Sequence, residues 1–93
     1  MIKSFADKET EELYFTGKSK KMNQVIIKTA LRKLDYLNAA VSIKDLKVPP
    51  GNRLEALKGD LKGKYSIRIN DQYRIIFYFE DVNAFEVEII DYH

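Results

Sequence analysis

Residues 65–79 of this chain read YSIRINDQYRIIFYF, and this stretch decides the fold. Apolar and polar side chains alternate on both sides of the central Asn-Asp-Gln, which is the period-two pattern of two β-strands. Opposite residues of an antiparallel pair point to the same face, so an odd number of loop residues keeps both faces consistent. A three-residue loop, Asn70 to Gln72, meets this condition and places Arg68 opposite Arg74.

The facing arginines call for an explanation, because like charges directly opposite each other destabilise a sheet. One interpretation is an anion site between the two guanidinium groups, and arginine suits phosphate in particular. The other is that both side chains point into solvent or form ion pairs with Glu86 or Glu88 on a neighbouring strand. The pattern alone leaves both interpretations open.

Length and composition indicate one small folded domain, residues 1–93. The chain is 45% hydrophobic, with six tyrosines and five phenylalanines. It has no cysteine, which excludes disulfides, thiolate metal ligands and a thiol nucleophile. No apolar run reaches the roughly 20 residues of a membrane span. No signal-peptide core follows Met1, so we expect a cytoplasmic protein that does not enter a membrane.

Charge is unevenly distributed, although the formal net charge is only +2. Residues 18–33 contain six basic side chains and no acidic one, whereas residues 71–93 contain six acids and a single base. A basic stripe of this kind permits binding of a polyanion such as RNA on one side of the molecule. We expect this contact from Lys21, Lys28 and Arg32, which share much of one helix face. A solvated lysine-rich surface is the alternative.

Outside the hairpin, the pattern predicts two helices and further β-segments. Asp7 caps a first helix that ends at Gly17, and Ser42 caps one short turn before a Pro-Pro pair. The expected elements are a β-segment at 2–5, helices at 7–15 and 22–39, strands at 54–57, 64–69, 73–80 and 84–90, and a turn at 81–83. This order is typical of an α+β domain with two N-terminal helices packed on a mostly antiparallel sheet.

The second helix carries an apolar stripe that we expect to face the core. Its apolar residues recur at intervals of three and four. These positions are Met22, Val25, Ile26, Ala30, Leu31, Leu34, Leu37 and Val41.

Candidate catalytic residues lie directly after a predicted strand and at the C-terminus. Lys58 precedes Gly59 at a strand end and can add a cation near the arginines. His93, the only histidine, has an unperturbed pKa of about 6.5, which suits proton transfer near neutral pH. Asp91 can orient its ring, and Tyr92 can stack on a base or donate a proton. The alternative is an incidental histidine at a frayed end, although an apolar strand anchors it.

No phosphate-loop, dinucleotide-binding or zinc-peptidase motif occurs, and one histidine without cysteine argues against a metal site. We therefore expect neither a metal nor a cofactor. Arginine, lysine, tyrosine, histidine and carboxylates suit metal-free cleavage of RNA, in which the ribose 2′-hydroxyl attacks the adjacent phosphate. The protein then supplies a proton acceptor, a proton donor and cations for the phosphate.

Several short motifs occur together in one order. Residues 1–5 read MIKSF, 49–54 read PPGNRL, 57–60 read LKGD, 65–70 read YSIRIN, 72–75 read QYRI and 91–93 read DYH. Over its whole length the chain thereby resembles the HigB branch of the RelE/ParE toxin superfamily. The motifs of the second half are the specific part of this resemblance.

The resemblance implies a RelE/ParE-like fold and a toxin of a bacterial type II toxin–antitoxin system. Such toxins cleave mRNA on the translating ribosome without a metal, and a helix-turn-helix antitoxin of the HigA type neutralises them. Lys58, Arg68 and Arg74 match the cationic positions of the family's cleft. Residues 91–93 match its C-terminal motif. Glu55 departs from the pattern, because some HigB-like toxins carry histidine there; glutamate can accept a proton or repel phosphate.

The leading hypothesis is thus a ribosome-dependent endoribonuclease that inhibits translation. Arg74 and Arg68 would stabilise the phosphate with help from Lys58, and His93 with Asp91 would move protons. The alternatives are a non-catalytic growth inhibitor of the gyrase-poison (ParE) type and a weakly active RNA- or ribosome-binding toxin. Cleavage of RNA on translating ribosomes distinguishes the first hypothesis, and a DNA-supercoiling assay distinguishes the gyrase poison.

Overall fold

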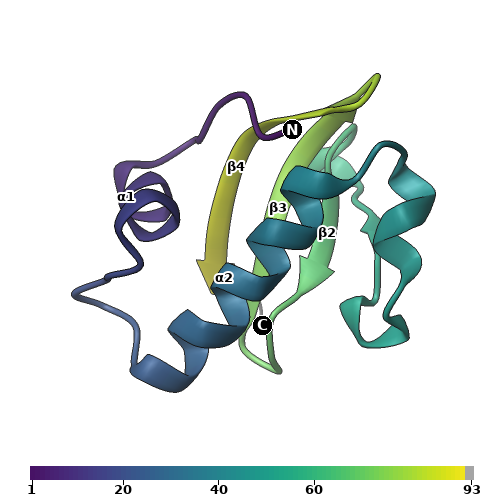
Figure 1. Ribbon diagram of the computed structural model, residues 1–93. Helices are drawn as coiled ribbons and strands as arrows, with labels where there is room; N and C mark the ends of the chain where they lie inside the picture. The colour runs from purple at the N-terminus through teal and green to yellow at the C-terminus, as the bar shows by residue number, and fades with distance from the viewer. Residues whose placement is uncertain (92–93) are drawn as a thin grey trace.

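The computed structural model describes residues 1–91 and shows two helices against one face of a four-stranded sheet (Figure 1). The strands follow one another in the sheet in chain order, and every neighbouring pair is antiparallel. The elements are α1 (Lys8–Thr16), α2 (Gln24–Ala39), β1 (Glu55–Ala56), β2 (Tyr65–Arg68), β3 (Tyr73–Glu80) and β4 (Asn83–Asp91). The predicted α+β class and β-meander are confirmed.

The β2–β3 hairpin has the register that the alternation predicts. Arg68 lies opposite Arg74, and in the next pair Ile67 lies opposite Ile75. The three-residue loop 70–72 is therefore confirmed. Isoleucines 67 and 75 are fully buried, which shows that the odd loop directs the apolar set into the core.

The helix ends follow the capping signals with small differences. Gly17 ends α1 in the left-handed conformation, with φ 74°, and its N–H donates to the carbonyl of Leu13 at 2.8 Å. Asp7 stands at the N-cap position, but its side chain makes no capping hydrogen bond. Helix α2 begins two residues later than predicted, because the Asn23 side chain accepts a hydrogen bond from the N–H of Ile26 at 3.0 Å.

Three strands differ from the prediction in their bounds, β1, β2 and β4. β1 and β2 are shorter than 54–57 and 64–69. The turn after β3 has two residues, since Asn83 already pairs with Glu80. The N-terminal segment makes two isolated parallel bridges to β4, one from Ile2 and one from Phe5. It therefore lies beside β4 without forming a regular strand.

The predicted apolar stripe of α2 is only partly confirmed. Ala30, Leu34 and Leu37 are buried as expected, but Val25 is 78% exposed and Val41 is 66% exposed. Val25 lies five residues before Ala30, about 140° around the helix, and so projects from the opposite face. Val41 lies beyond Ala39, the last residue of α2. Figure 1 shows α2 lying across the sheet, with α1 on the side of β4. The main core fills this interface with Leu13, Ile27, Ala30, Leu34, Leu37, Ala40, Leu46, Ile67, Ile69, Ile75, Phe77, Ala84 and Val87.

A buried polar pair connects α2 to the loop before β1. The ammonium of Lys33, a residue only 4% exposed, donates to the side-chain carbonyl of fully buried Asn52. The Asn52 amide nitrogen in turn donates to the carbonyls of Leu46 and Val48, at 3.1 and 3.4 Å. Burial lowers the pKa of Lys33, and nearby Arg32 and Arg68 lower it further. Asn52 thus joins α2 to the backbone of Leu46 and Val48.

We predict that Asn52→Ala lowers the free energy of unfolding by about 3 kcal/mol, because a buried ammonium and two carbonyls lose their partner. The matched control is Asn23→Ala, which removes one exposed capping bond and should cost about 1 kcal/mol. Urea unfolding of both variants measures the difference. An equal effect of the two substitutions would show that the buried pair contributes no more than a surface cap.

Candidate functional site

Three of the predicted site residues, Glu55, Arg68 and Arg74, belong to the face of the sheet that points away from α2, which we call the outer face. Ile67, Ile75 and Phe77 belong to the main core on the inner face. Side chains alternate along a strand, so their neighbours Arg68 and Arg74 point outward. Helix and arginines therefore lie on opposite sides of the sheet.

Two rows of residues cross the outer face. The arginine row consists of Arg68 on β2, Arg74 on β3 and Ile90 on β4, which are cross-strand neighbours. The adjacent row consists of Glu55, Ser66, Ile76 and Glu88, which are likewise cross-strand neighbours on β1 to β4. Glu55 on β1 and Arg74 on β3 stand two strands apart, with β2 between them. A contact between them therefore depends on the length of both side chains.

Arg74 is the most buried cation of the outer face, with 7% of the residue exposed. Its Nη1 forms an ion pair with Glu55 Oε1 at 3.1 Å, and its Nη2 donates to the carbonyl of Arg53 at 2.6 Å. Arg53 adopts the left-handed conformation, with φ 45°, and this turns its carbonyl toward the guanidinium. Because a buried charge needs such partners, the chain holds Arg74 in a fixed position.

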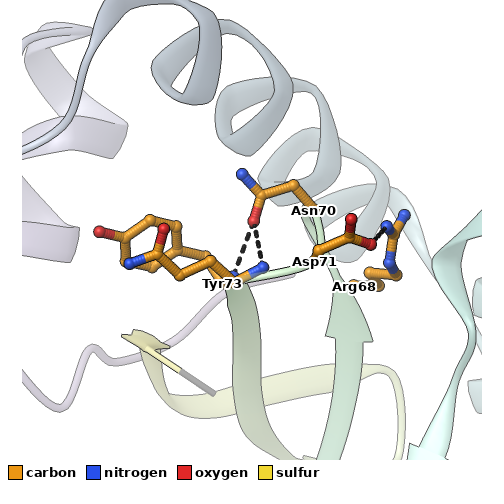
Figure 2. A network of polar contacts seen from close by, with 5 residues as sticks. Arg68, Asn70, Asp71 and Tyr73 are labelled. Carbon is orange, nitrogen blue, oxygen red and sulfur yellow. Dashed lines mark hydrogen bonds and ion pairs between the residues drawn. The ribbon is translucent and has the colours of Figure 1, made fainter. Parts of the chain in front are cut away.

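Arg68 is placed differently, at the rim of the row. Its Nη2 donates to the carboxylate of Asp71 in the hairpin loop (Figure 2). The Asp71 side chain is 98% exposed, so this pair is weak and solvent-screened. The described ion pairs of the two arginines use Asp71 and Glu55, in place of the strand residues Glu86 and Glu88 that the sequence offered.

The hairpin loop is internally ordered and tied to β4. The Asn70 side-chain oxygen accepts hydrogen bonds from the N–H groups of Gln72 and Tyr73, at 2.9 and 2.7 Å (Figure 2). The Gln72 amide donates to the carboxylate of Asp91 at 3.1 Å, and Asp91 lies opposite Tyr73. Asp91 thus lies beside the hairpin loop at the end of β4, in register with Tyr73, which packs against the core of the inner face. It is not a member of the arginine row, and Tyr92 and His93 lie outside the described residues.

Lys58 is less closely associated with the arginines than predicted. It is exposed, at the end of β1 three residues beyond Glu55. Contacts within residues 1–91 join Glu55 to Arg74, but they join Lys58 to neither arginine. Lys58 therefore lies beside the site without completing it.

The basic residues expected to bind RNA do not form one helix face. Lys21 precedes α2 and forms an ion pair with Glu9 on α1 at 2.9 Å. This hydrogen-bonded partner raises the pKa of Lys21. Lys28 and Arg32 are exposed on α2, on the other side of the sheet from the arginine row.

Sequence reasoning missed two groups that shape the site. The carbonyl of Arg53 holds Arg74, and Asn52 holds the loop that presents this carbonyl. The type of a residue does not reveal that its backbone carbonyl accepts a hydrogen bond. An asparagine after Pro-Pro-Gly, by contrast, is a turn signal. Residues 1–91 contain no group of three or more histidine, aspartate or glutamate side chains placed to hold a metal. None of the helices in that range is long and apolar enough to cross a membrane.

Comparison with known proteins finds similarity to one family of toxins. A family model described as RelE-like toxin of type II toxin-antitoxin system HigB matches residues 3–93. Toxin HigB-1 of Vibrio cholerae serotype O1 is 48% identical over 82 residues, which are 87% of this chain and 86% of that protein.

Solved structures agree with the fold. The YoeB-YefM complex from Staphylococcus aureus matches with a TM-score of 0.63 at 20% identity, covering 100% of this chain and 98% of that chain. A YafQ mutant from E. coli matches with a TM-score of 0.60 at 15% identity, covering 98% and 91%. The outer-face arginines thus lie on a RelE-like scaffold, and the family match over nearly the full length shows that the chain belongs to the HigB-like toxins of type II toxin–antitoxin systems.

Proposed function

We propose that this toxin is a metal-free endoribonuclease that cleaves mRNA on the translating ribosome and thereby inhibits translation. The observation that carries the proposal is Arg74, a nearly buried guanidinium held by Glu55 and a backbone carbonyl, with Arg68 directly opposite. A fixed cation of this kind suits a phosphate whose charge increases during cleavage. Membership of the HigB-like family supports the same reaction.

The two arginines act on the scissile phosphate. Arg74 is already oriented, so little reorganisation is needed when RNA binds. Arg68 is 31% exposed and its partner Asp71 is almost fully exposed, so a phosphate can replace Asp71 at small cost. The two guanidinium forks then contact one phosphate from adjacent strands. Lys58 supplies a further positive charge at the edge of the site.

Proton transfer uses the carboxylates and the C-terminal motif. Glu55 is half exposed and contacts Arg74, so its free carboxylate oxygen can accept the 2′-hydroxyl proton next to the bound phosphate. His93 donates a proton to the leaving 5′-oxygen, with Asp91 orienting its ring. Tyr92 positions the target base by stacking.

The proposed substrate also defines the partners and the compartment. Lys28 and Arg32, with a smaller contribution from the paired Lys21, contact the ribosomal RNA backbone on the side of α2. This reaction takes place in the cytoplasm. A helix-turn-helix antitoxin of the HigA type neutralises the toxin; one structural neighbour is described as a YoeB-YefM toxin-antitoxin complex.

We predict that expression of the wild-type toxin without an antitoxin arrests growth and produces new 5′ ends within the codons of translated messages. Arg74→Gln should reduce single-turnover cleavage on ribosomes about a hundredfold, because it removes the cation that faces the phosphate. Primer extension and quenched-flow cleavage measure the two effects. Glutamine is shorter than arginine and does not replace the contact with the Arg53 carbonyl, so thermal unfolding of the variant is measured in parallel to show that the fold persists.

Lys62→Ala is the matched control, because it removes an exposed cation outside the arginine row. It should cleave like the wild type. Intact messages in arrested cells would refute the ribonuclease, and inhibition of DNA supercoiling in the same cells would support the gyrase-poison alternative. Wild-type cleavage by Arg74→Gln would exclude Arg74 from the reaction.

Removal of His93 alone should reduce cleavage about a hundredfold, since a positioned general acid contributes roughly that factor. The melting temperature should remain within a degree or two, because one terminal residue contributes little to the core. Thermal unfolding and single-turnover cleavage of the truncated chain test both statements. Undiminished cleavage would leave Glu55, Arg68 and Arg74 as the reacting set.

Charge reversal at Lys28 and Arg32 should weaken ribosome association and lower its salt dependence by about 1.4 in the slope of log affinity against log salt, as for two lost phosphate contacts. The control reverses Lys44 and Lys47, two exposed lysines of the short helix Ile43–Lys47, and changes the net charge equally. Equal effects of both double variants would indicate a general charge effect and no defined contact.

A further inference from the structure

A third row crosses the outer face at the end of the sheet farthest from the arginines. Tyr78 on β3 lies opposite Phe85 on β4. Lys64, the residue before β2, places its ammonium 5.1 Å from the centre of the Tyr78 ring. We call Lys64, Tyr78 and Phe85 the aromatic row. It combines two aromatic side chains with a cation on a face of the sheet that α1 and α2 leave uncovered.

A cavity of about 390 Å³ lies against this row. It is lined by Gly63, Tyr78, Phe79, Glu80 and Phe85. Gly63 has φ +98°, and a Cβ there would lie 3.5 Å from the edge of the Tyr78 ring. The positive φ favours glycine at this position, whereas a Cβ would make only an ordinary van der Waals contact with the ring.

The two aromatic rings of the row leave surface for a ligand, although Lys64 lies over one face of the Tyr78 ring. Both residues are partly exposed. Ring contacts within residues 1–91 join other aromatic residues, so neither Tyr78 nor Phe85 is engaged by a neighbouring ring. The partly exposed rings of Tyr78 and Phe85 leave apolar surface in contact with water. A planar ligand that stacks on these rings would remove that surface from water.

We propose that the aromatic row is a stacking subsite for a nucleobase of the message that flanks the cleaved nucleotide. The inference rests on the proposed function and extends its substrate contacts along β3. Sheets that bind single-stranded RNA stack bases on exposed aromatic side chains and hold the backbone with cations. The aromatic row provides both groups, and the cavity is large enough for one planar base.

The position of the row fits a neighbouring nucleotide and not the reacting one. Tyr78 follows Arg74 by four residues on the same strand and the same face. Four residues of a strand span about 13 Å, which is too far for one base whose own phosphate contacts Arg74. A short single-stranded segment that runs along β3 can reach both points. Lys64 then lies where it can contact the phosphate of the stacked nucleotide.

The charges around the cavity favour a base over an apolar peptide. Glu80 lines the cavity and Lys64 stands over the ring, so both a carboxylate acceptor and a cation border the stacking surface. A nucleotide offers the N–H groups of its base edge to the carboxylate and its phosphate to the ammonium. An apolar side chain would leave both charges partly desolvated without a partner.

The test uses ribosome complexes programmed with messages that carry one abasic nucleotide at each position flanking the cut. For the wild type, the half-saturating toxin concentration should rise about tenfold at one flanking position, with an unchanged maximal rate, because one stacked base is lost. Tyr78→Leu should show the same tenfold increase on the intact message. This variant keeps an apolar side chain of similar burial, so the fold is retained.

The decisive comparison is the combination of both changes. Tyr78→Leu should be insensitive to the abasic position that weakens the wild type, and Tyr78→Phe, which keeps the ring, should behave as the wild type. Equal sensitivity of Tyr78→Leu and the wild type at every position would overturn the subsite. If the wild type cleaves no message at all, the proposed function fails, whereas cleavage without any dependence on Tyr78 refutes this inference alone.

Discussion

The odd loop between β2 and β3 is the constraint on which the rest of the structure depends. Three residues between the strands place Ile67 and Ile75 in the core and both arginines on the outer face. A slip of one residue would exchange the faces of one strand and bury charge under α2. Asn70 holds the loop in this form, so a single side chain helps to fix which face becomes the core and which becomes the site.

The burial of Arg74 follows from this register and requires support from the opposite side of the sheet. Its guanidinium is held by the carbonyl of Arg53, which follows directly after Asn52. The asparagine is anchored by Lys33 from α2 and by two loop carbonyls. A lysine that faces the helix layer is thereby connected, through one loop, to the cation of the outer face. The buried ammonium of Lys33, which is costly beside an otherwise apolar core, is thus one end of this connection.

The sequence was sufficient for the sheet and less so for the site. Periodicity predicted the meander, the β3 bounds and the Arg68–Arg74 pair, because a period of two leaves few registers. It could not reveal that Lys33 is buried, since a lysine within a basic run looks like a surface residue. Nor could it assign the partners of the arginines: Glu55 is distant in sequence from Arg74, and their contact arises only from the pairing of β1 with β2.

The glutamate at position 55 resolves the electrostatic problem that the two arginines create. Without RNA, two guanidinium groups on adjacent strands repel each other, and one of them is nearly buried. A carboxylate beside Arg74 offsets this repulsion, which a neutral histidine at the same position would not do. In the proposed reaction, a bound phosphate would supply negative charge in place of the carboxylate. Glu55 would then be available as a proton acceptor next to the substrate, so the residue that offsets the repulsion also fits the proposed chemistry.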